Sequence, residues 1–273
     1  MNHTRISPIL RINTEGGKIV DDKLTVEEPL EIVVGFGTAQ KRQRQTIAVT
    51  MRTPDHDFDL ALGFLFTEGV IARKKDVANI RFLSENKVLV DLNEHISLDI
   101  NRLNRHFYTT SSCGVCGKSS LEAVATTSCF FLNPQKPLIR QDFFFDLPTK
   151  LRLAQSVFDE TGGTHASALF DTEGVLLTVF EDVGRHNALD KLVGWALQQE
   201  LLPLDNHILL VSGRTSFELI QKAVMAGIPI VAAVGAPSSL AVELAEENNV
   251  TLVGFLRKNG FNVYSGSQRI DFK

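Results

Sequence analysis

The last third of the chain contains three short, almost wholly apolar runs, which limit the folds open to it. They cover residues 208–211, 230–234 and 251–256, and each has the length of a buried strand. Helix-forming stretches separate them, and the first begins with a capping-box spacing between Thr215 and Glu218. Strands joined by helices run parallel in one sheet. We therefore expect a sheet whose last three inner strands are parallel.

The residues before these strands continue the alternation of helix and strand. A helix is predicted over 148–159, a hairpin over 166–170 and 175–181, and a further helix over 187–199. The resulting order, helix-strand-strand-helix-strand-helix-strand, is typical of an α/β sandwich. We assign residues 138–273 to this C-terminal domain.

The first half of the chain is predicted to be a smaller α+β domain over residues 18–137. Residues 1–17 are expected to be a loose N-terminal segment, and the proline-containing stretch 133–137 marks the approximate boundary between the domains. The predicted elements are a strand pair at 30–36 and 46–52, a helix with Thr53 as its N-cap, and a strand pair at 80–83 and 87–92.

Composition and charge argue against several classes of protein. The 273 residues are 44% hydrophobic and 22% charged, which is ordinary for a globular protein. A net charge of -4 and a pI near 6.0 argue against general binding of nucleic acid. No apolar run approaches a membrane span, and the first ten residues lack the apolar region of a signal peptide. We expect a soluble cytoplasmic protein that binds neither nucleic acid nor membranes.

Two of the three cysteines, Cys113 and Cys116, lie in a segment that is poorly suited to a protein core. Residues 109–120 include six Ser or Thr residues and two Gly residues, so the thiols are the only soft nucleophiles there. Lys118 and a predicted helix start at Ser119 add positive charge, which favours thiolate over thiol. The segment is typical of a catalytic or sulfur-carrying thiol.

Three other interpretations of the cysteine pair remain open. A structural disulfide is uncommon in the reducing compartment that so few cysteines indicate. Half of a zinc ribbon would need a second ligand pair, and the third cysteine, Cys129, lies in an apolar stretch. A thioredoxin-type redox motif follows an early strand of a β-α-β unit, whereas this pair follows the polar segment 101–106.

Loops at the ends of the three apolar strands have the composition of an anion site. In open α/β sheets, ligands bind beyond the carboxyl ends of the strands, where loops lead into helix N-termini. The candidate residues are Ser212, Gly213, Arg214 and Thr215 in the first loop, 235–239 in the second, and Arg257 and Lys258 in the third. Small residues also serve as caps and tight turns, so a structural role remains open for each loop. No Walker A string is present.

Two histidines flank the predicted hairpin. His165 comes shortly after two adjacent glycines, and His186 directly follows Arg185. Each histidine could orient a ligand or protonate a leaving sulfur. Each could equally belong to an ion-pair network with Asp182 or Arg185, and the sequence leaves both alternatives open.

Four short motifs follow one another along the chain. They are Ser-Ser-Cys113-Gly-Val-Cys116-Gly, Thr161-Gly-Gly-Thr-His165-Ala, Glu181-Asp-Val-Gly-Arg185-His186-Asn187 and Ser212-Gly-Arg-Thr-Ser216. Together they resemble the motifs of the FdhD/NarQ family of formate dehydrogenase accessory sulfur carriers. The four motifs also occur in the same order as in that family. The resemblance covers essentially residues 29–270, which makes it far more specific than a CxxC pair alone.

The resemblance implies a sulfurtransferase. Such a protein receives sulfur from a cysteine desulfurase as a persulfide on Cys113, with Cys116 as the assisting neighbour. It passes this sulfur to the bis-molybdopterin guanine dinucleotide form of the molybdenum cofactor, for which GDP is a partial mimic. The implied client is formate dehydrogenase, and no intrinsic metal is implied.

The resemblance also implies a cytidine-deaminase-like, three-layer α/β fold for the C-terminal domain and a homodimer. It places the bound cofactor at one segment near the C-terminus, and we expect the neighbouring strand ends to contribute. The implied segment is Phe255, Leu256, Arg257, Lys258, Asn259 and Gly260, and the neighbouring candidates are Ser212, Gly213, Arg214, Thr215 and His165.

Two rival functions follow from the same features. A zinc deaminase requires H-x-E before P-C-x-x-C, with the Glu as proton shuttle. Here the cysteine pair precedes His165, no Pro precedes Cys113, and Ser167 stands where the Glu would be. The second rival is a non-catalytic chaperone that binds the cofactor and docks on the apo-dehydrogenase while its cysteines merely hold a ligand.

Overall fold

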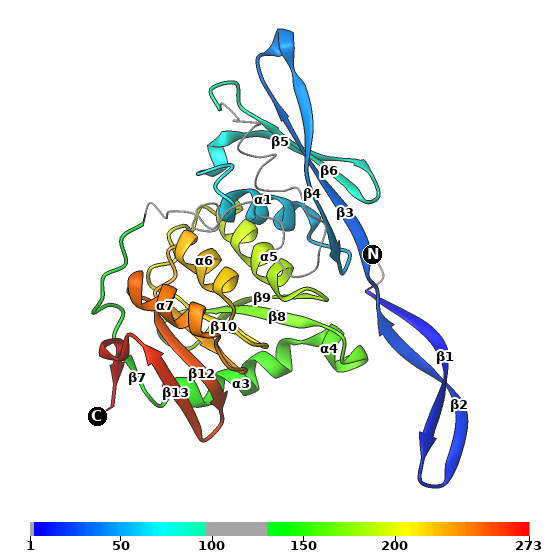
Figure 1. Ribbon diagram of the computed structural model, residues 1–273, viewed down its shortest axis with the longest axis vertical. Helices are drawn as coiled ribbons and strands as arrows, with labels where there is room; N and C mark the ends of the chain where they lie inside the picture. The colour runs from blue at the N-terminus through cyan, green and yellow to red at the C-terminus, as the bar shows by residue number, and fades with distance from the viewer. Residues whose placement is uncertain (1–2, 97–129, 273) are drawn as a thin grey trace.

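The computed structural model describes residues 3–96 and 130–272, which form four β-sheets and the helices packed on them. The largest sheet has six strands in the order β13-β12-β11-β10-β8-β9 (Figure 1). Its strands are β8 (His165–Phe170), β9 (Leu176–Asp182), β10 (Ile208–Val211), β11 (Ile230–Ala233), β12 (Thr251–Arg257) and β13 (Gly260–Ser265).

Three neighbouring strands of this sheet, β10, β11 and β12, are parallel, which confirms the sequence prediction. The strand β8 lies antiparallel beside β10 and forms the predicted hairpin with β9. The last strand, β13, pairs antiparallel with β12 and forms the opposite edge. The carboxyl ends of the three parallel strands therefore meet at one end of the sheet.

Helices cover both faces of the six-stranded sheet. On one face lies α3 (Phe143–Ala154), and on the other lie α5 (Arg185–Gln198), α6 (Phe217–Met225) and α7 (Ser239–Glu247). Side chains alternate along β10, so Leu210 packs in the core with α3 and Leu209 packs in the core with α5 and α6. The sheet and its two helical layers form the predicted three-layer α/β sandwich.

The prediction of a single helix over 148–159 is wrong, because the chain forms two helices there. The first is α3, and the second is α4 (Ser156–Thr161), with Gln155 between them at a non-helical ψ of 76°. The carboxylate of Glu181 on β9 accepts hydrogen bonds from the backbone N–H groups of Val157 and Phe158. This tertiary contact caps a new helix, and the local sequence pattern does not contain it.

The N-terminal half contains a four-stranded sheet in the order β4-β3-β6-β5. Its strands are β3 (Glu28–Phe36), β4 (Gln43–Arg52), β5 (Val77–Ser84) and β6 (Lys87–Leu92), and 3-10 turns of this half lie at Ala39–Lys41 and Lys74–Asp76. A further 3-10 turn, Ser267–Arg269, lies near the C-terminus. Both predicted strand pairs are confirmed, since β4 pairs with β3 and β5 with β6, each antiparallel. No helix in the described ranges is long and apolar enough to cross a membrane.

The helix α1 (Asp57–Thr67) joins the two halves of the molecule by crossing α5 at very short range. A Cβ atom on Gly194 of α5 would lie 1.8 Å from the carbonyl oxygen of Asp59, and one on Gly63 of α1 would lie 1.8 Å from that of Asp190. Only glycine at both positions allows the two backbones to approach this closely. The hydrophobic core around this crossing takes side chains from both sides of residue 137.

The proline-containing stretch near the predicted domain boundary is tied to the C-terminal domain. The buried guanidinium of Arg269 donates to the carbonyl oxygens of Lys136 (2.7 Å) and Asn133 (2.6 Å) and to the hydroxyl of Thr251 on β12 (3.1 Å). Beyond it, β7 (Ile139–Arg140) pairs in parallel with β14 (Ile270–Asp271). The boundary segment is therefore a fixed part of the structure rather than a free linker.

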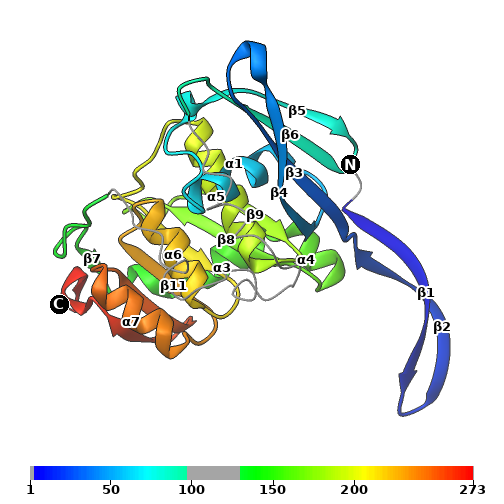
Figure 2. The ribbon, with the colours of Figure 1, turned by 45° about the horizontal axis from the view of Figure 1, so that its top comes forward.

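The expectation that residues 1–17 form a loose segment is wrong for the described residues. The strands β1 (Thr4–Asn13) and β2 (Gly16–Thr25) pair antiparallel and form a hairpin that projects from the body (Figures 1 and 2). At the turn, Gly16 has a φ of +133°, a conformation that favours glycine. Alternating apolar residues and this turn make a hairpin, which composition alone does not reveal.

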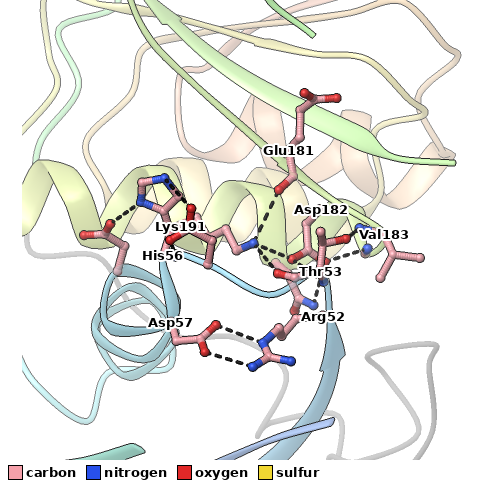
Figure 3. Close-up of polar contacts among 12 residues, drawn as sticks. Arg52, Thr53, His56, Asp57, Glu181, Asp182, Val183 and Lys191 are labelled. Atoms are coloured by element: carbon pink, nitrogen blue, oxygen red, sulfur yellow. Dashed lines mark hydrogen bonds and ion pairs between the residues drawn. The ribbon is translucent and has the colours of Figure 1, made fainter. Parts of the chain in front are cut away.

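Thr53 is not the N-cap of a helix. The helix α1 begins at Asp57, and Asp55 and His56 before it have positive φ angles of 91° and 57°. Thr53 instead binds the other half of the molecule (Figure 3): its N–H donates to Asp182 (3.2 Å) and its carbonyl oxygen accepts from Lys191 (2.9 Å). These long-range bonds outweigh the local capping preference.

Candidate functional site

The three strand-end loops predicted to converge do lie side by side. The N–H of Gly235 donates to the carbonyl oxygen of Gly213 (3.0 Å), and the N–H of Phe255 donates to that of Gly235 (3.0 Å). Thr215 and Pro237 form an isolated parallel bridge between the first two loops. A Cβ on Gly235 would lie 2.8 Å from the backbone nitrogen of Arg214, so this contact requires glycine.

An anion site at these loops would use free backbone N–H groups, but several of these groups already have partners. The amides of Gly235 and Phe255 are used in the contacts between loops. The N–H of Thr215 donates to the carbonyl oxygen of Ala236 (3.1 Å), and that of Ser238 donates to the carbonyl oxygen of Thr215 (3.0 Å). These amides hold the loops together and are not available to an anion.

Positively charged side chains surround the joined loops. The guanidinium of Arg257 donates to the carbonyl oxygens of Val234 (2.6 Å) and Leu256 (2.8 Å), which holds it over the end of β11. Arg214 in the first loop and Lys258 in the third are exposed. Because a guanidinium can bind a phosphate with two parallel N–H groups, this end of the sheet is suited to an anionic group.

Phe255 has the most unusual backbone among the predicted site residues. It adopts a φ of +51°, rare for a residue with a large side chain, within an irregular stretch of pairing between Gly254 and Arg257. Its side chain is 45% exposed, whereas the neighbouring Leu256 is fully buried in the core with α3. Such strain is common at functional sites, and here it turns an aromatic ring outward at the strand ends.

A cavity of about 540 Å³ opens beside these loops, on the face of the sheet covered by α3. Its walls come from α3, the α3–α4 junction, the two-glycine turn and the strand ends. The lining residues are Pro148, Leu151, Arg152, Gln155, Phe158, Gly162, Gly163, Thr164, His165, Ser212 and Val234. Two of the predicted site residues, His165 and Ser212, therefore line one cavity, and Val234 connects this cavity to Arg257.

The two cavity-lining candidates differ in what their side chains already bind. The hydroxyl of Ser212 accepts a hydrogen bond from the N–H of Ala166 (2.8 Å), which joins β8 to the loop after β10. His165 is half-buried, and burial, followed by the positive charge of Arg185, lowers the pKa of its imidazole. The lowered pKa favours the neutral form of this imidazole.

His186 and Thr215 lie beneath the loops. Burial lowers the pKa of His186 to about 3, and its Nε2 lies 3.3 Å from the hydroxyl of Ser216 at the start of α6. Thr215 is almost completely buried. His186 therefore contacts the start of α6, and Thr215 is shielded from solvent.

A buried polar network holds α5 against β9 and the segment around Thr53 (Figure 3). The sequence pattern predicted only part of this network. The carboxylate of Asp182 pairs with the ammonium of Lys191 at 2.8 Å and accepts hydrogen bonds from the N–H groups of Thr53 and Gly184. Asn187 also donates to Asp182, at 3.0 Å. Asp182 and Asn187 of this motif therefore have structural roles in holding α5.

Cys113 and Cys116 lie outside the described residues. Among the described candidates, the structure brings together Arg214, Arg257, Lys258 and Phe255 at the strand ends, with His165 and Ser212 in the adjacent cavity. It separates Leu256 and Thr215 from that surface by burying them.

Comparison with known proteins gives one consistent result. The model of the FdhD/NarQ family matches residues 25–271. A "Sulfur carrier protein FdhD" of Mycolicibacterium paratuberculosis is 53% identical over 258 residues, which is 91% of this chain and 92% of that protein. The protein of the same name in Streptomyces coelicolor is 50% identical over 272 residues, covering 96% and 94%.

The overall fold also has a counterpart among solved structures. A crystal structure from Desulfotalea psychrophila, described as a formate dehydrogenase accessory protein, superposes with a TM-score of 0.77. It is 21% identical in sequence, and the match covers 99% of this chain and 100% of that one. The mixed α/β architecture is therefore shared along the whole length of both chains.

Proposed function

The chain belongs to the FdhD/NarQ family, and on this premise we propose that it is a sulfur carrier for the maturation of formate dehydrogenase. It takes sulfur from a cysteine desulfurase and transfers it to the bis-molybdopterin guanine dinucleotide form of the molybdenum cofactor, before or during insertion into the enzyme. One observation carries the proposal: relatives named sulfur carrier proteins share about half of their residues with this chain over nearly its full length.

The chemistry needs only the two thiols of the CxxC pair. The thiolate of Cys113 attacks the outer sulfur of the donor persulfide, the S–S bond breaks, and the donor cysteine leaves as a thiolate. Attack of Cys116 on the inner sulfur of the new persulfide then forms a disulfide and releases sulfide. The two electrons that the sulfide carries come from the thiols, so the step requires no other reductant until the disulfide is reduced again.

The strand ends supply what an acceptor with phosphates and a purine would need. Arg214, Arg257 and Lys258 provide positive charge for the phosphates. The outward ring of Phe255 offers an aromatic surface for a base, and the cavity beside His165 has apolar walls with a few polar groups. These features support the acceptor site that we propose at residues 255–260 and the adjoining loops.

Three finer features belong to the same proposal. We propose that the C-terminal sandwich, with helices on both faces of a sheet that has a parallel centre, has a cytidine-deaminase-like fold. We also propose that the protein is a homodimer and that it acts in the cytoplasm. In this arrangement the molybdenum cofactor is a substrate that accepts sulfur.

The persulfide is tested by incubating the reduced protein with cysteine and a cysteine desulfurase. We expect intact-mass analysis to show the addition of one sulfur atom, which peptide mapping places on Cys113 and which a reductant removes. Cys113→Ala should abolish the adduct because the attacking thiolate is lost, whereas the matched variant Cys129→Ala should keep it.

The same experiment separates the sulfur carrier from the cofactor-binding chaperone. A chaperone would show no adduct, and its Cys113→Ala variant would still activate formate dehydrogenase. That pair of results would contradict the sulfur-carrier proposal, while binding of GDP would remain.

The acceptor site is tested with Arg257→Ala and GDP as a partial mimic. We expect roughly a tenfold increase in the dissociation constant for GDP, measured by calorimetry, because a charge-assisted hydrogen bond to phosphate is lost. The persulfide yield should not change. Arg140→Ala is the matched control, since this exposed arginine of β7 pairs with Asp142 and lies outside the strand ends. Loss of both GDP binding and persulfide yield would indicate misfolding, and unchanged GDP binding would contradict the assigned site.

A further inference from the structure

The hairpin of β1 and β2, here called the arm, is a sheet of its own. Each strand has ten residues, and the strands stay paired from Thr4 and Thr25 at the base to Asn13 and Gly16 at the tip. Figures 1 and 2 show it projecting away from the body. An isolated two-stranded hairpin is only marginally stable in water, so a surface that packs on the arm would stabilise it.

One face of the arm is apolar and exposed. Ile6, Leu10 and Ile12 of β1 point to this face with Ile19 of β2, and they are between 62% and 74% exposed. The same face also has Pro8, Asp21 and Lys23, and the opposite face has Arg5, Arg11 and Lys18 beside Ile9, Val20 and Leu24. The four most exposed apolar side chains of the arm therefore lie together on one face, and α4 contacts this face at its base.

The base of the arm is anchored to the body, which sets its direction. The hydroxyls of Thr25 on β2 and Thr161 on α4 are 2.7 Å apart, and Lys23 forms an ion pair with Glu160 at 2.9 Å. These contacts hold the base on α4 while the outer part continues into solvent. At about 3.4 Å per residue, a ten-residue strand spans roughly 30 Å, long enough to lie along a second molecule.

The edge of the arm is less suited than its face to binding another strand. Pro8 lies within β1, opposite Asp21 of β2. A proline within a paired strand is tolerated where its missing N–H would point away from the partner, so Pro8 removes a donor from the free edge of β1. Prolines at such positions protect edges from further pairing. The apolar face is therefore better suited than the free edge of β1 to bind another molecule.

We propose that the apolar face of the arm packs against a second copy of this chain in a two-fold arrangement. At their observed exposures, its four Ile and Leu side chains leave roughly 500 Å² of apolar surface in water, as much as the largest patch on a typical monomer. Two arms would bury roughly 1,000 Å² before any surface of the body is added, which reaches the size of a specific interface. A two-fold axis brings both arms into the interface at once.

This inference rests on the proposed homodimer and names the surface that forms it. The test is sedimentation of the full-length chain from about 0.1 to 100 µM, with the double variant Leu10→Asp/Ile19→Lys. Leu10 and Ile19 lie directly opposite each other on the apolar face, so the variant keeps a favourable cross-strand pair while removing apolar surface. The matched control is Lys18→Asp, which places an Asp-Arg pair with Arg11 on the opposite face.

We expect the wild-type chain and Lys18→Asp to sediment as dimers with twice the 30.2 kDa chain mass. The double variant should dimerise roughly 100-fold more weakly, because two large apolar side chains are lost from each copy. A monomeric wild-type chain across the range would overturn the proposal. So would a dimer that the double variant leaves unchanged, since another surface would then form it, or a control that dissociates to the same extent.

Two further measurements keep the result interpretable. Circular dichroism and thermal unfolding of the double variant should match those of the wild-type chain, because the substituted side chains are exposed. Persulfide formation on Cys113 reports the sulfur-carrier function separately. A monomeric variant that still gains sulfur would support the arm contact and leave the sulfur chemistry intact, whereas a dimer that gains no sulfur would contradict only the function.

Discussion

Lys222→Met is expected to lower the free energy of unfolding by about 3–5 kcal/mol, because it leaves a carboxylate buried without its partner. The ammonium of Lys222 on α6 lies 2.9 and 3.0 Å from the two carboxylate oxygens of Asp190 on α5, and 2.9 Å from the hydroxyl of Thr67 on α1. Glu68 lies 3.6 Å away. This group joins three helices at the centre of the molecule.

The charge state of the pair explains the size of the expected effect. Burial acts to lower the pKa of Lys222, but the carboxylates of Asp190 and Glu68 hold that pKa above its ordinary value. Burial raises the pKa of Asp190 against the opposing effect of Lys222. Each side chain therefore depends on the other to remain ionised away from water.

Urea unfolding followed by circular dichroism measures this prediction. The double variant Lys222→Met/Asp190→Leu should regain part of the lost stability, since apolar side chains replace both buried charges. Arg140→Ala, which breaks an ion pair with Asp142 in which both side chains are well exposed, should leave the unfolding midpoint unchanged. A single variant at Lys222 as stable as the wild-type chain would show that the buried network contributes little.

Gly194→Ala is the second substitution with a large expected effect, a loss of about 3 kcal/mol. The new Cβ would lie 1.8 Å from the carbonyl oxygen of Asp59 and 2.8 Å from the nitrogen of Gly63. Both are backbone atoms, so no side-chain rotation relieves the clash, and α1 must move away from α5. Because the core around this crossing includes side chains from both halves, the displacement would loosen both.

The matched control is Gly260→Ala. A Cβ at Gly260 would meet no atom within 4 Å, and the residue has no positive φ. We expect the urea midpoint to fall strongly for the variant at Gly194 and to change little for the control. Equal urea midpoints for the two variants would mean that α1 and α5 can move apart without loss of stability. That result would contradict the argument that their close approach requires glycine.

Several elements followed directly from local patterns. The apolar runs at 208–211, 230–234 and 251–256 are the parallel centre of the sheet, and both N-terminal strand pairs form as predicted. The convergence of the three loops followed from strand direction alone, since parallel strands end on the same side. Hydrophobic periodicity and connection length are properties of neighbouring residues, so the sequence contains them explicitly.

Other features depended on residues far apart in the chain. Thr53 has the chemistry of an N-cap, but bonds to Asp182 and Lys191 place it outside the helix. The loop amides expected to bind an anion instead bind neighbouring loops. Neither Gly63 nor Gly194 has a local signal that marks it as a crossing point, because the need for glycine comes from the helix on the other side.

The amino-acid sequence by itself determined the family, the order of strands and helices, and the end of the sheet where the polar loops lie. Each of these depends on short motifs or on the spacing of apolar residues along the chain. Only the tertiary structure decided which candidates face outward, where α1 meets α5, and that the N-terminus forms an arm. These features depend on which residues from distant parts of the chain form hydrogen bonds with each other and fill the same space. A local sequence pattern does not show which of these residues will meet.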